Sequence, residues 1–230
     1  MKIDVLDHGY VRLIGNFGSD LEVVNSARVS YDKSVDFIDS KDERLLEFLI
    51  KNKHDSTLRH CTISFEIYAP LMIARQWYKH AVSSTHLDDQ NGWNESSRRY
   101  VTEEPVFYEP RKWRTSPSNS KQGSGDPVHP DMSARISERL KYHIDESVNL
   151  YNSLLASGVA TEQARLFLPA YAMYVRWRWT TSLNAVLHFC SLRQAEDAQL
   201  EIQEYGNAVL SIVKDLYPLS TRYWERHRIG

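Results

Sequence analysis

Seven consecutive residues at 94–100, Asn-Glu-Ser-Ser-Arg-Arg-Tyr, contain no aliphatic side chain and carry the groups that bind an anion. The adjacent guanidiniums of Arg98 and Arg99 match a phosphate bidentately. The hydroxyls of Ser96 and Ser97 can complete the hydrogen bonds of its oxygens. No glycine-rich loop accompanies the segment, so it is not a Walker site. A solvated loop would have a similar composition, and the segment by itself leaves both interpretations open.

A helix is predicted over residues 71–84, because Pro70 suits the first turn of a helix. Four polar side chains of this helix lie at i, i+3, i+4 and i+7 and therefore share one face: Gln76, Lys79, His80 and Ser83. Three other side chains of this helix can face the core: Ala74, Trp77 and Tyr78. The polar face is a second candidate for ligand contacts.

Two isolated arginines lie among apolar residues of predicted helices. Arg193 continues an apolar stripe, so it either reaches water from the helix end or contacts an anionic or carbonyl partner. Arg165 lies in a short predicted helix, where it either pairs with Glu162 or contacts an anion or a nucleobase edge. The sequence alone leaves both choices open.

The nine histidines and two cysteines form neither a metal pattern nor a disulfide framework. His54 and His60 are six residues apart, as are residues 80 and 86, whereas a helical zinc site needs i, i+4 spacing. Cys61 and Cys190 have no neighbouring histidine in the sequence that would mark a nucleophile. We therefore expect no metal and two cysteines buried as small hydrophobic residues.

The composition is ordinary for a soluble globular protein, with 42% hydrophobic and 25% charged residues among 230. The formal net charge of −2 argues against a general nucleic-acid binder, because a phosphate backbone attracts a basic excess. The first residues lack the organisation of a signal peptide, and no apolar run reaches the ~20 residues that span a bilayer. We expect a cytoplasmic protein, or one in the host cytoplasm if its source is viral.

The expected architecture is a single α+β domain over residues 1–230, in which long helices pack with a small, mostly antiparallel sheet. Alternating apolar residues predict strands at 61–70 and 173–179. Helical spacing and capping residues predict the helices at 20–30, 42–54, 71–84, 133–157, 162–168, 183–194 and 195–218. The segment 115–131 is rich in Ser, Gly and Pro and is expected to be a mobile loop.

Taken together, RQWYKH (75–80) and NESSRRY (94–100) resemble the signature of the flavin-dependent thymidylate synthases. That family typically shows RQW, an Arg-His-Arg triplet and a serine-containing segment that ends in RY. Further blocks are similar to the family in the same order: ARVSYDK (27–33), KHDSTLRH (53–60), ARLFLP (164–169) and LRQAEDAQLEIQEY (192–205). The resemblance covers the chain from about residue 27 to 217.

The resemblance implies the reductive methylation of dUMP to dTMP. Methylenetetrahydrofolate would be the carbon donor, and FAD reduced by NADPH would be the hydride source, while the protein supplies position and electrostatics. The family needs no thiol nucleophile, which agrees with two cysteines expected in the core. The resemblance also implies a homotetramer whose active sites combine residues of more than one subunit.

The family's site residues carry over to matching positions in this sequence. Those implied for dUMP are Gln76, Lys79, Glu95, Ser96, Ser97, Arg98, Arg99, Arg165 and Arg193. Those implied for FAD are Ser30, Ser56, Lys79, His80, Ala81, Glu95, Ser182, Asn184 and His188. Arg193 is the implied catalytic residue, because a fixed cation that faces the uracil favours ionisation at N3.

Two departures from the family pattern leave an alternative open. The family's Arg-His-Arg is Lys79, His80 and Ala81 here, and the spacer before residue 94 is longer. Lys79 keeps a cation without the planar fork, and Ala81 has no charge. A non-catalytic nucleotide- or flavin-binding relative would bind dUMP or FAD without turnover. A nucleic-acid-binding module is a third interpretation, and it conflicts with the acidic balance of charges.

Overall fold

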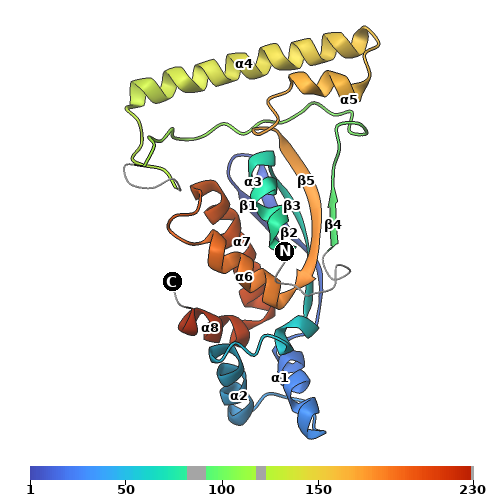
Figure 1. Ribbon diagram of the computed structural model, residues 1–230, viewed down its shortest axis with the longest axis vertical. Helices are drawn as coiled ribbons and strands as arrows, with labels where there is room; N and C mark the ends of the chain where they lie inside the picture. Colours follow the sequence, from blue (N-terminus) through green and yellow to red (C-terminus); the bar gives the residue numbers. More distant parts are fainter. Residues whose placement is uncertain (82–91, 118–122, 229–230) are drawn as a thin grey trace.

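The centre of the molecule is an antiparallel sheet (Figure 1). The structure is a computed structural model that describes residues 1–81, 92–117 and 123–228. The strands across the sheet are, in order, β1 (Lys2–Val5), β2 (Gly9–Phe17), β3 (Thr62–Pro70), β5 (Tyr174–Ser182) and β4 (Gly92–Glu95). Each neighbouring pair is antiparallel, which confirms the expected kind of sheet.

The two long strands β3 and β5 form because apolar and polar side chains alternate along them. Phe65 of β3 lies opposite Trp179 of β5, and their stacked rings have centroids 5.8 Å apart. Arg176 and Arg178 point to the other face of the sheet and are exposed. The structure therefore confirms both predicted strands.

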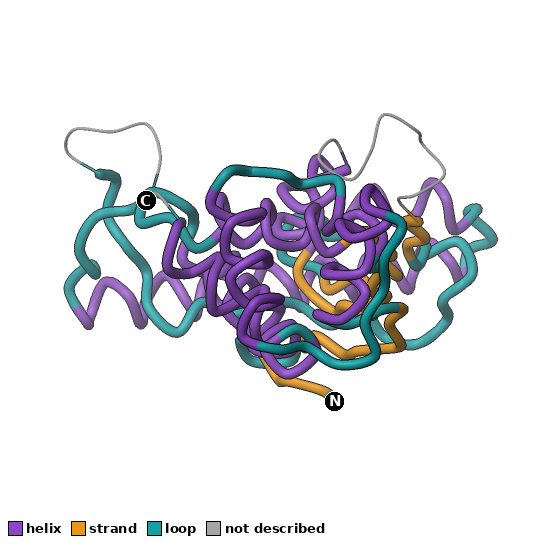
Figure 2. The backbone as a smooth tube through the Cα atoms, turned by 90° about the horizontal axis from the view of Figure 1, so that it is seen from below, coloured by secondary structure: helices purple, strands orange, loops and turns teal. Residues whose placement is uncertain are grey.

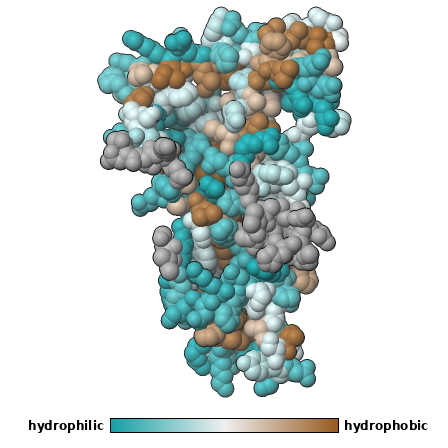
Figure 3. Space-filling model, in the orientation of Figure 1, coloured by the Kyte–Doolittle hydropathy of each residue, from teal (hydrophilic) through white to brown (hydrophobic). Residues whose placement is uncertain are grey.

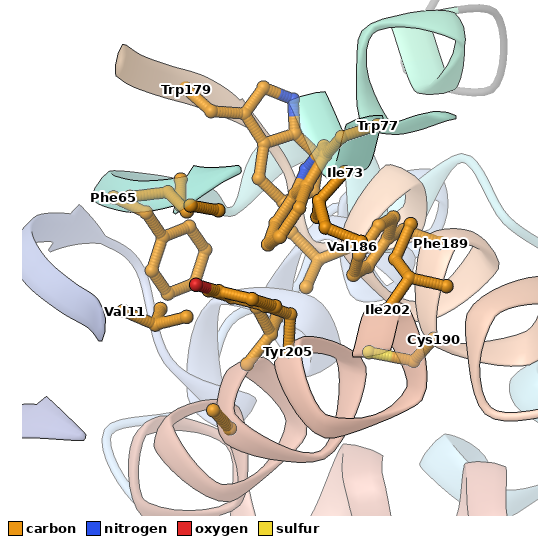
Figure 4. Close-up of a cluster of buried hydrophobic side chains, with 14 of the residues drawn as sticks. Val11, Phe65, Ile73, Trp77, Trp179, Val186, Phe189, Cys190, Ile202 and Tyr205 are labelled. Carbon is orange, nitrogen blue, oxygen red and sulfur yellow. The ribbon is translucent and has the colours of Figure 1, made fainter. Parts of the chain in front are cut away.

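Three helices cover the apolar face of the sheet: α3 (Leu71–Trp77), α6 (Leu183–Arg193) and α7 (Leu200–Leu216). Figure 4 shows the core between them, where Trp77 of α3 stacks on Phe189 of α6 with ring centroids 4.2 Å apart. Tyr205 of α7 donates its hydroxyl to the main-chain oxygen of Tyr68 in β3 at 2.8 Å. This shared core fixes α3 and α6, whose C-terminal ends carry candidate site residues.

A second group of helices lies at one end of the sheet, and Figure 2 looks onto this end of the molecule. Its members are α1 (Asp20–Arg28), η1 (Val29–Tyr31), α2 (Ser40–Lys51), η2 (Thr57–His60) and α8 (Pro218–His227). Ser19 caps α1 by accepting a hydrogen bond from the main chain of Leu21. Arg226 of α8 donates to Glu47 of α2 at 2.8 Å and joins the last helix of the chain to the N-terminal half.

A layer at the opposite end is formed by α4 (Pro130–Ala156), α5 (Thr161–Ala164) and η5 (Arg165–Phe167). Ile144 and Tyr151 are buried on the inner side of α4, while most of its outer residues are exposed. Hydrophobic side chains form a band along this layer (Figure 3). The Trp113 indole nitrogen donates to Ser137 Oγ at 2.9 Å, so α4 rests on the segment that precedes it.

The segment that precedes α4 is hydrogen-bonded in its described part. The main-chain nitrogen of Thr115 donates to the oxygen of Asp126, and that of Val128 donates to the oxygen of Trp113, both at 2.9 Å. Residues 113–117 and 123–128 therefore lie side by side. The predicted loop at 115–131 ends too late, because α4 already begins at Pro130. Residues 118–122 lie outside the described part, and the mobility of the loop stays a prediction.

Other expectations need correction. Tyr78 is 56% exposed although Ala74 and Trp77 are buried, because α3 tightens into the 3-10 turn η3 (Tyr78–Ala81) and turns Tyr78 away from the core. Residues 82–84 of the predicted helix, including Ser83, lie outside the described residues. The sequence interpretation also misses five of the described elements: β1, β2, β4, η2 and α8. None of the described helices is long and apolar enough to cross a membrane.

Candidate active site

Residues of the 94–100 segment line a pocket of about 880 Å³ beside the edge strand β4. The chain leaves the sheet at Ser96, whose main-chain nitrogen donates to the oxygen of Arg176 at 2.7 Å. The Ser96 hydroxyl oxygen accepts from the main-chain nitrogen of Arg176 at 3.0 Å, and so extends the ladder between β4 and β5. Ser96 is thus held in the pocket wall, and its hydroxyl hydrogen can still be donated to a ligand.

A tight turn follows Ser96 and presents Ser97 and Arg99. The main-chain oxygen of Ser97 accepts from the nitrogens of Tyr100 and Val101 at 2.9 and 3.1 Å. Arg99 is exposed on this turn, and its guanidinium lies 5.2 Å from the centre of the Tyr100 ring. Ser97 lines the pocket of its own chain, whereas Arg99 is not among the residues that line it.

Arg98 is the guanidinium of this turn that enters the pocket. Its Nη1 donates to the main-chain oxygen of Glu103 at 2.6 Å, and the group lies 5.7 Å from the centre of the Tyr151 ring. Its Nε is buried and has no hydrogen-bond partner among the described residues. A buried donor of this kind is satisfied by an anionic ligand or by water.

Arg165 reaches the same pocket from η5, which is far from residues 94–100 in the sequence. Its Nε donates to the main-chain oxygen of Glu162 at 3.3 Å rather than to the Glu162 carboxylate. The charged residues that line the pocket are Arg75, Arg98, Arg165, Arg176, Glu95, Glu103 and Glu104. Four guanidiniums against three carboxylates, with two serine hydroxyls, suit a phosphate ester.

Arg75 and Arg176 belong to this pocket although the sequence interpretation assigns neither of them to a ligand. Arg75 pairs with Glu95 at 3.9 Å, and the Arg176 guanidinium lies 5.7 Å from the centre of the Tyr68 ring. Arg75 is the first residue of the RQW block, and Arg176 is one of the arginines that alternate with tryptophans in β5. Those two signals could have identified them.

A second cluster forms around Arg193, the last residue of α6. The Arg193 Nε donates to His80 Nε2 at 2.8 Å, and His80 is buried, with its ring edge-on to Phe189. Burial, and then the positive charges of Arg193 and His188, lower the pKa of His80 to about 4. His80 is therefore neutral at pH 7 and accepts this hydrogen bond, which fixes the orientation of the Arg193 guanidinium.

His188 and Asn184 line a pocket of about 280 Å³ on the outer side of α6. The His188 ring lies 6.0 Å from the ring of His80, so this pocket adjoins the second cluster. Other polar residues that line it are Lys53, Asp55, Ser191, His227 and Arg228. The lining combines two cationic side chains and one carboxylate with several hydrogen-bonding groups, a set that can hold an anionic group.

The other residues expected to bind FAD are placed differently. Ser182 is fully buried, and its hydroxyl accepts from the main-chain nitrogen of Ala185, so it is the predicted cap of α6. Ser30 in η1 and Ser56 before η2 are exposed, and neither lines the pocket of Asn184 and His188. The structure thus gives Ser182 a structural role and leaves the two exposed serines as proposals.

The polar face predicted for α3 meets the connection between α6 and α7. Gln76 donates to Gln199, which immediately precedes α7, at 2.6 Å, while His80 accepts from Arg193 at the end of α6. Lys79 and Ala81 are part of η3, but their side chains lie outside what the structure describes. Their predicted contacts stay predictions.

Both cysteines are buried, as expected. Burial raises the pKa of the Cys61 and Cys190 thiols to about 12, so neither is a thiolate at neutral pH. Within the described ranges, no group of three or more His, Cys, Asp or Glu residues could hold a metal ion.

One chain brings the predicted residues together in two clusters. The first lines the large pocket and contains Glu95, Ser96, Ser97, Arg98 and Arg165. The second contains His80, His188 and Arg193. Arg193 does not line the large pocket, and Arg99 is exposed beside it. A pocket lined by guanidiniums and hydroxyls and a fixed cation are both present, but no described pocket of a single chain contains them together.

Comparisons with known proteins show the family to which the chain belongs. Residues 12–219 match the family model described as thymidylate synthase complementing protein. The chain is 34% identical to a flavin-dependent thymidylate synthase of Thermus thermophilus over 99% of this chain and 79% of that protein. It is also 34% identical to that of Thermotoga neapolitana over 95% and 91% of the two chains.

A solved structure shares the fold. The UMP/dUMP methylase PolB from Streptomyces cacaoi, crystallised with 5-Br dUMP, superposes with a TM-score of 0.82. The two sequences are 26% identical, and the match covers 98% of both chains. On the family match and the identity to its relatives, the chain belongs to the thymidylate synthase complementing family, the family of the flavin-dependent thymidylate synthases.

Proposed function

We propose that this chain converts dUMP to dTMP by reductive methylation, with methylenetetrahydrofolate as the carbon donor and NADPH as the source of electrons for FAD. Its family makes it a thymidylate synthase and therefore a methyltransferase. The observation that carries the proposal is the pocket in which residues 95–98 and Arg165 meet from distant parts of the chain. The bromo-dUMP in the PolB crystal supports the same substrate class.

The large pocket would hold the phosphate of dUMP. Arg98 offers a buried Nε without a protein partner, and the Ser96 and Ser97 hydroxyls lie on the same wall. Arg165 adds a guanidinium whose Nε bonds only to a main-chain oxygen, so its terminal nitrogens can face a ligand. Charge-assisted hydrogen bonds of this kind hold a phosphate that stays charged throughout the reaction.

Arg193 would face the uracil ring. Removal of the N3 proton places negative charge on the pyrimidine and makes C5 more nucleophilic, and a cation already held in position stabilises this charge without reorganisation. His80 supplies that position, because its neutral ring accepts the Arg193 Nε–H at 2.8 Å. This hydrogen bond to His80 orients the two terminal nitrogens of Arg193 without the help of a ligand.

The residues around Asn184 and His188 fit a flavin dinucleotide. The cationic side chains of the smaller pocket, Lys53 and Arg228, suit its pyrophosphate, and the His188 ring and the amide of Asn184 can serve its polar groups. When bound, the flavin supplies the hydride that turns the transferred methylene into a methyl group. The chain's part is to hold it beside Arg193 and His80.

We further propose that the active site is completed by a second copy of the chain in a homotetramer. The separation of Arg193 from the large pocket within one chain supports this, because one substrate must reach both groups. Exposed Arg99, on the turn beside the large pocket, would then contact the substrate where the second copy closes the site. The cytoplasmic location expected from the sequence stays part of the proposal.

An absorbance spectrum of the purified protein tests the function first. A yellow protein is expected, its flavin bleached by NADPH, with dTMP formed once dUMP and methylenetetrahydrofolate are added. A colourless protein that forms no dTMP after addition of FAD would contradict the proposal. Binding of dUMP and FAD without any dTMP in a single turnover would instead identify a non-catalytic relative.

A further inference from the structure

Gln76 ends a chain of hydrogen bonds that crosses the interior of the molecule. Its Nε2 donates to Gln199 Oε1 at 2.6 Å. Gln199 Nε2 in turn donates to Glu201 Oε2 at 2.9 Å and to the sulfur of Met72 at 3.5 Å. Gln76 and Gln199 are both half-buried, and Glu201 is only 4% exposed.

Glu201 is held as a carboxylate by donors from a different part of the chain. Arg114 Nη2 lies 2.9 Å from both carboxylate oxygens, and the Tyr108 hydroxyl donates to Oε1 at 3.1 Å. Arg114 is itself fixed through its Nε, which donates to Ser124 Oγ at 2.7 Å. A carboxylate with this many donors only accepts hydrogen bonds.

The acceptor-only carboxylate determines the direction of every amide in the chain. Glu201 requires Gln199 to present its NH₂ group, so the Gln199 oxygen must point to Gln76. That oxygen requires the NH₂ group of Gln76, so the Gln76 oxygen must point away from Gln199. An unrestrained glutamine can exchange its NH₂ and oxygen by a 180° turn of the amide, and Gln76 loses this freedom.

We propose that Gln199 and Glu201 are positioning residues that fix which end of the Gln76 amide faces the substrate, and that Arg114 holds Glu201 for this purpose. The inference rests on the proposed function, in which Gln76 contacts dUMP. The Gln76 oxygen takes no hydrogen bond from the described residues, so it is offered to a donor on the ligand. A fixed amide binds such a ligand more tightly, because no orientation has to be selected on binding.

A double-mutant cycle in the FAD-loaded protein tests the relay, with equilibrium dialysis of dUMP as the measurement. Gln199→Met keeps the length of the side chain and removes both hydrogen bonds, and we expect it to weaken dUMP binding about 10-fold. In a Gln76→Met background the same change should weaken binding less than about 2-fold, because Gln199 acts only through Gln76. Gln203→Met on α7 is the matched control, because Gln203 is half-buried and bonds only to the Ala198 main chain.

Each outcome decides one question. Equal weakening by Gln199→Met in both backgrounds, or no weakening when Gln76 is intact, would overturn the relay, while dUMP binding by the unmodified protein upholds the proposed function. Absence of dUMP binding by the unmodified protein would overturn both. Should Gln199→Met fail to fold, Gln199→Asn takes its place, since it keeps an amide but draws it back by one methylene. The same dependence on Gln76 is then expected.

Discussion

The guanidinium of Arg165 in the large pocket is held less firmly than the guanidinium of Arg193 in the second cluster. Arg165 is exposed in η5 and bonds through its Nε to a main-chain oxygen at 3.3 Å. Arg193 is half-buried, and its Nε bonds to the ring of a buried His80 at 2.8 Å. The first cluster brings several charged side chains together around one pocket. The second cluster fixes a single cation in one orientation.

The difference matches two different tasks. A phosphate is anionic before, during and after the reaction, so several mobile cations can hold it with equal effect at every stage. Negative charge on a uracil ring appears only as the reaction proceeds, and a preorganised cation favours that stage selectively. Changes in the pocket should therefore act on KM, and changes at Arg193 or His80 on kcat and on the stability of the cluster.

The largest effect is expected for Arg193→Ala. Loss of one preorganised donor typically lowers kcat by about 10²–10³-fold, and we expect a fall of this size with bound flavin retained. The unfolding free energy should change by only about 1 kcal/mol, because one hydrogen bond to a neutral ring is lost. Steady-state kinetics and urea unfolding measure the two quantities. Near-normal turnover would remove Arg193 from the mechanism, and Arg193→Lys should fall between the two proteins.

The buried histidine predicts a pH dependence of stability. The pKa of His80 is about 4 in the folded protein and near its ordinary 6.5 when unfolded, so the unfolded chain takes up the proton first as the pH falls. Stability should fall by about 3 kcal/mol between pH 6.5 and 4 from this group alone. His80→Gln keeps an acceptor for Arg193 but does not titrate, so its stability should fall less.

Urea unfolding at several pH values measures the contribution of His80 as the difference in unfolding free energy between the unmodified protein and His80→Gln. His143→Gln is the control, because His143 is exposed on α4. Its curve should run parallel to that of the unmodified protein. Parallel curves for His80→Gln as well would mean that His80 is not held neutral by its surroundings.

The smallest effects are expected for alanine variants of Arg98 and Arg99, which differ only in whether the melting temperature falls together with the rise in KM. Arg99→Ala should raise KM for dUMP about 10-fold without lowering the melting temperature, because the exposed guanidinium has only a ring contact among the described residues. Arg98→Ala should raise KM and also lower the melting temperature, because Arg98 bonds to the Glu103 main chain and packs on Tyr151. An unchanged KM in Arg99→Ala would place the substrate away from this turn.

Local patterns in the sequence account for much of the fold. The alternation in 61–70 and 173–179 predicts β3 and β5, and the serine before α6 predicts its cap, because these signals depend on neighbouring residues. β4 contributes only Gly-Trp-Asn-Glu and is a strand because it pairs with β5. The short β1 and the longer β2 pair with each other, and β2 also pairs with β3, contacts that no local sequence pattern predicts.

The site likewise contains residues that local sequence patterns predict and residues that they do not. The i, i+4 spacing of Gln76 and His80 predicts one polar face, and both residues do meet the connection between α6 and α7. The partners of that face could not be predicted, because Gln199 and Arg193 are placed by packing of helices distant in sequence. Arg114 and Glu201 are further examples, since a buried ion pair between residues so far apart leaves no periodic signal.

Complementation between two inactive variants tests the central claim most directly, namely that the large pocket and Arg193 belong to one site built from two copies of the chain. Arg193→Ala and the double variant Arg99→Ala, Arg165→Ala would be co-expressed with different tags, purified through both tags and assayed for dTMP formation. If each site combines both clusters from different copies, about a quarter of the sites in mixed oligomers are intact, and activity should return to about that fraction. If mixed oligomers form and stay as inactive as each variant alone, the clusters do not meet across copies and the account is wrong.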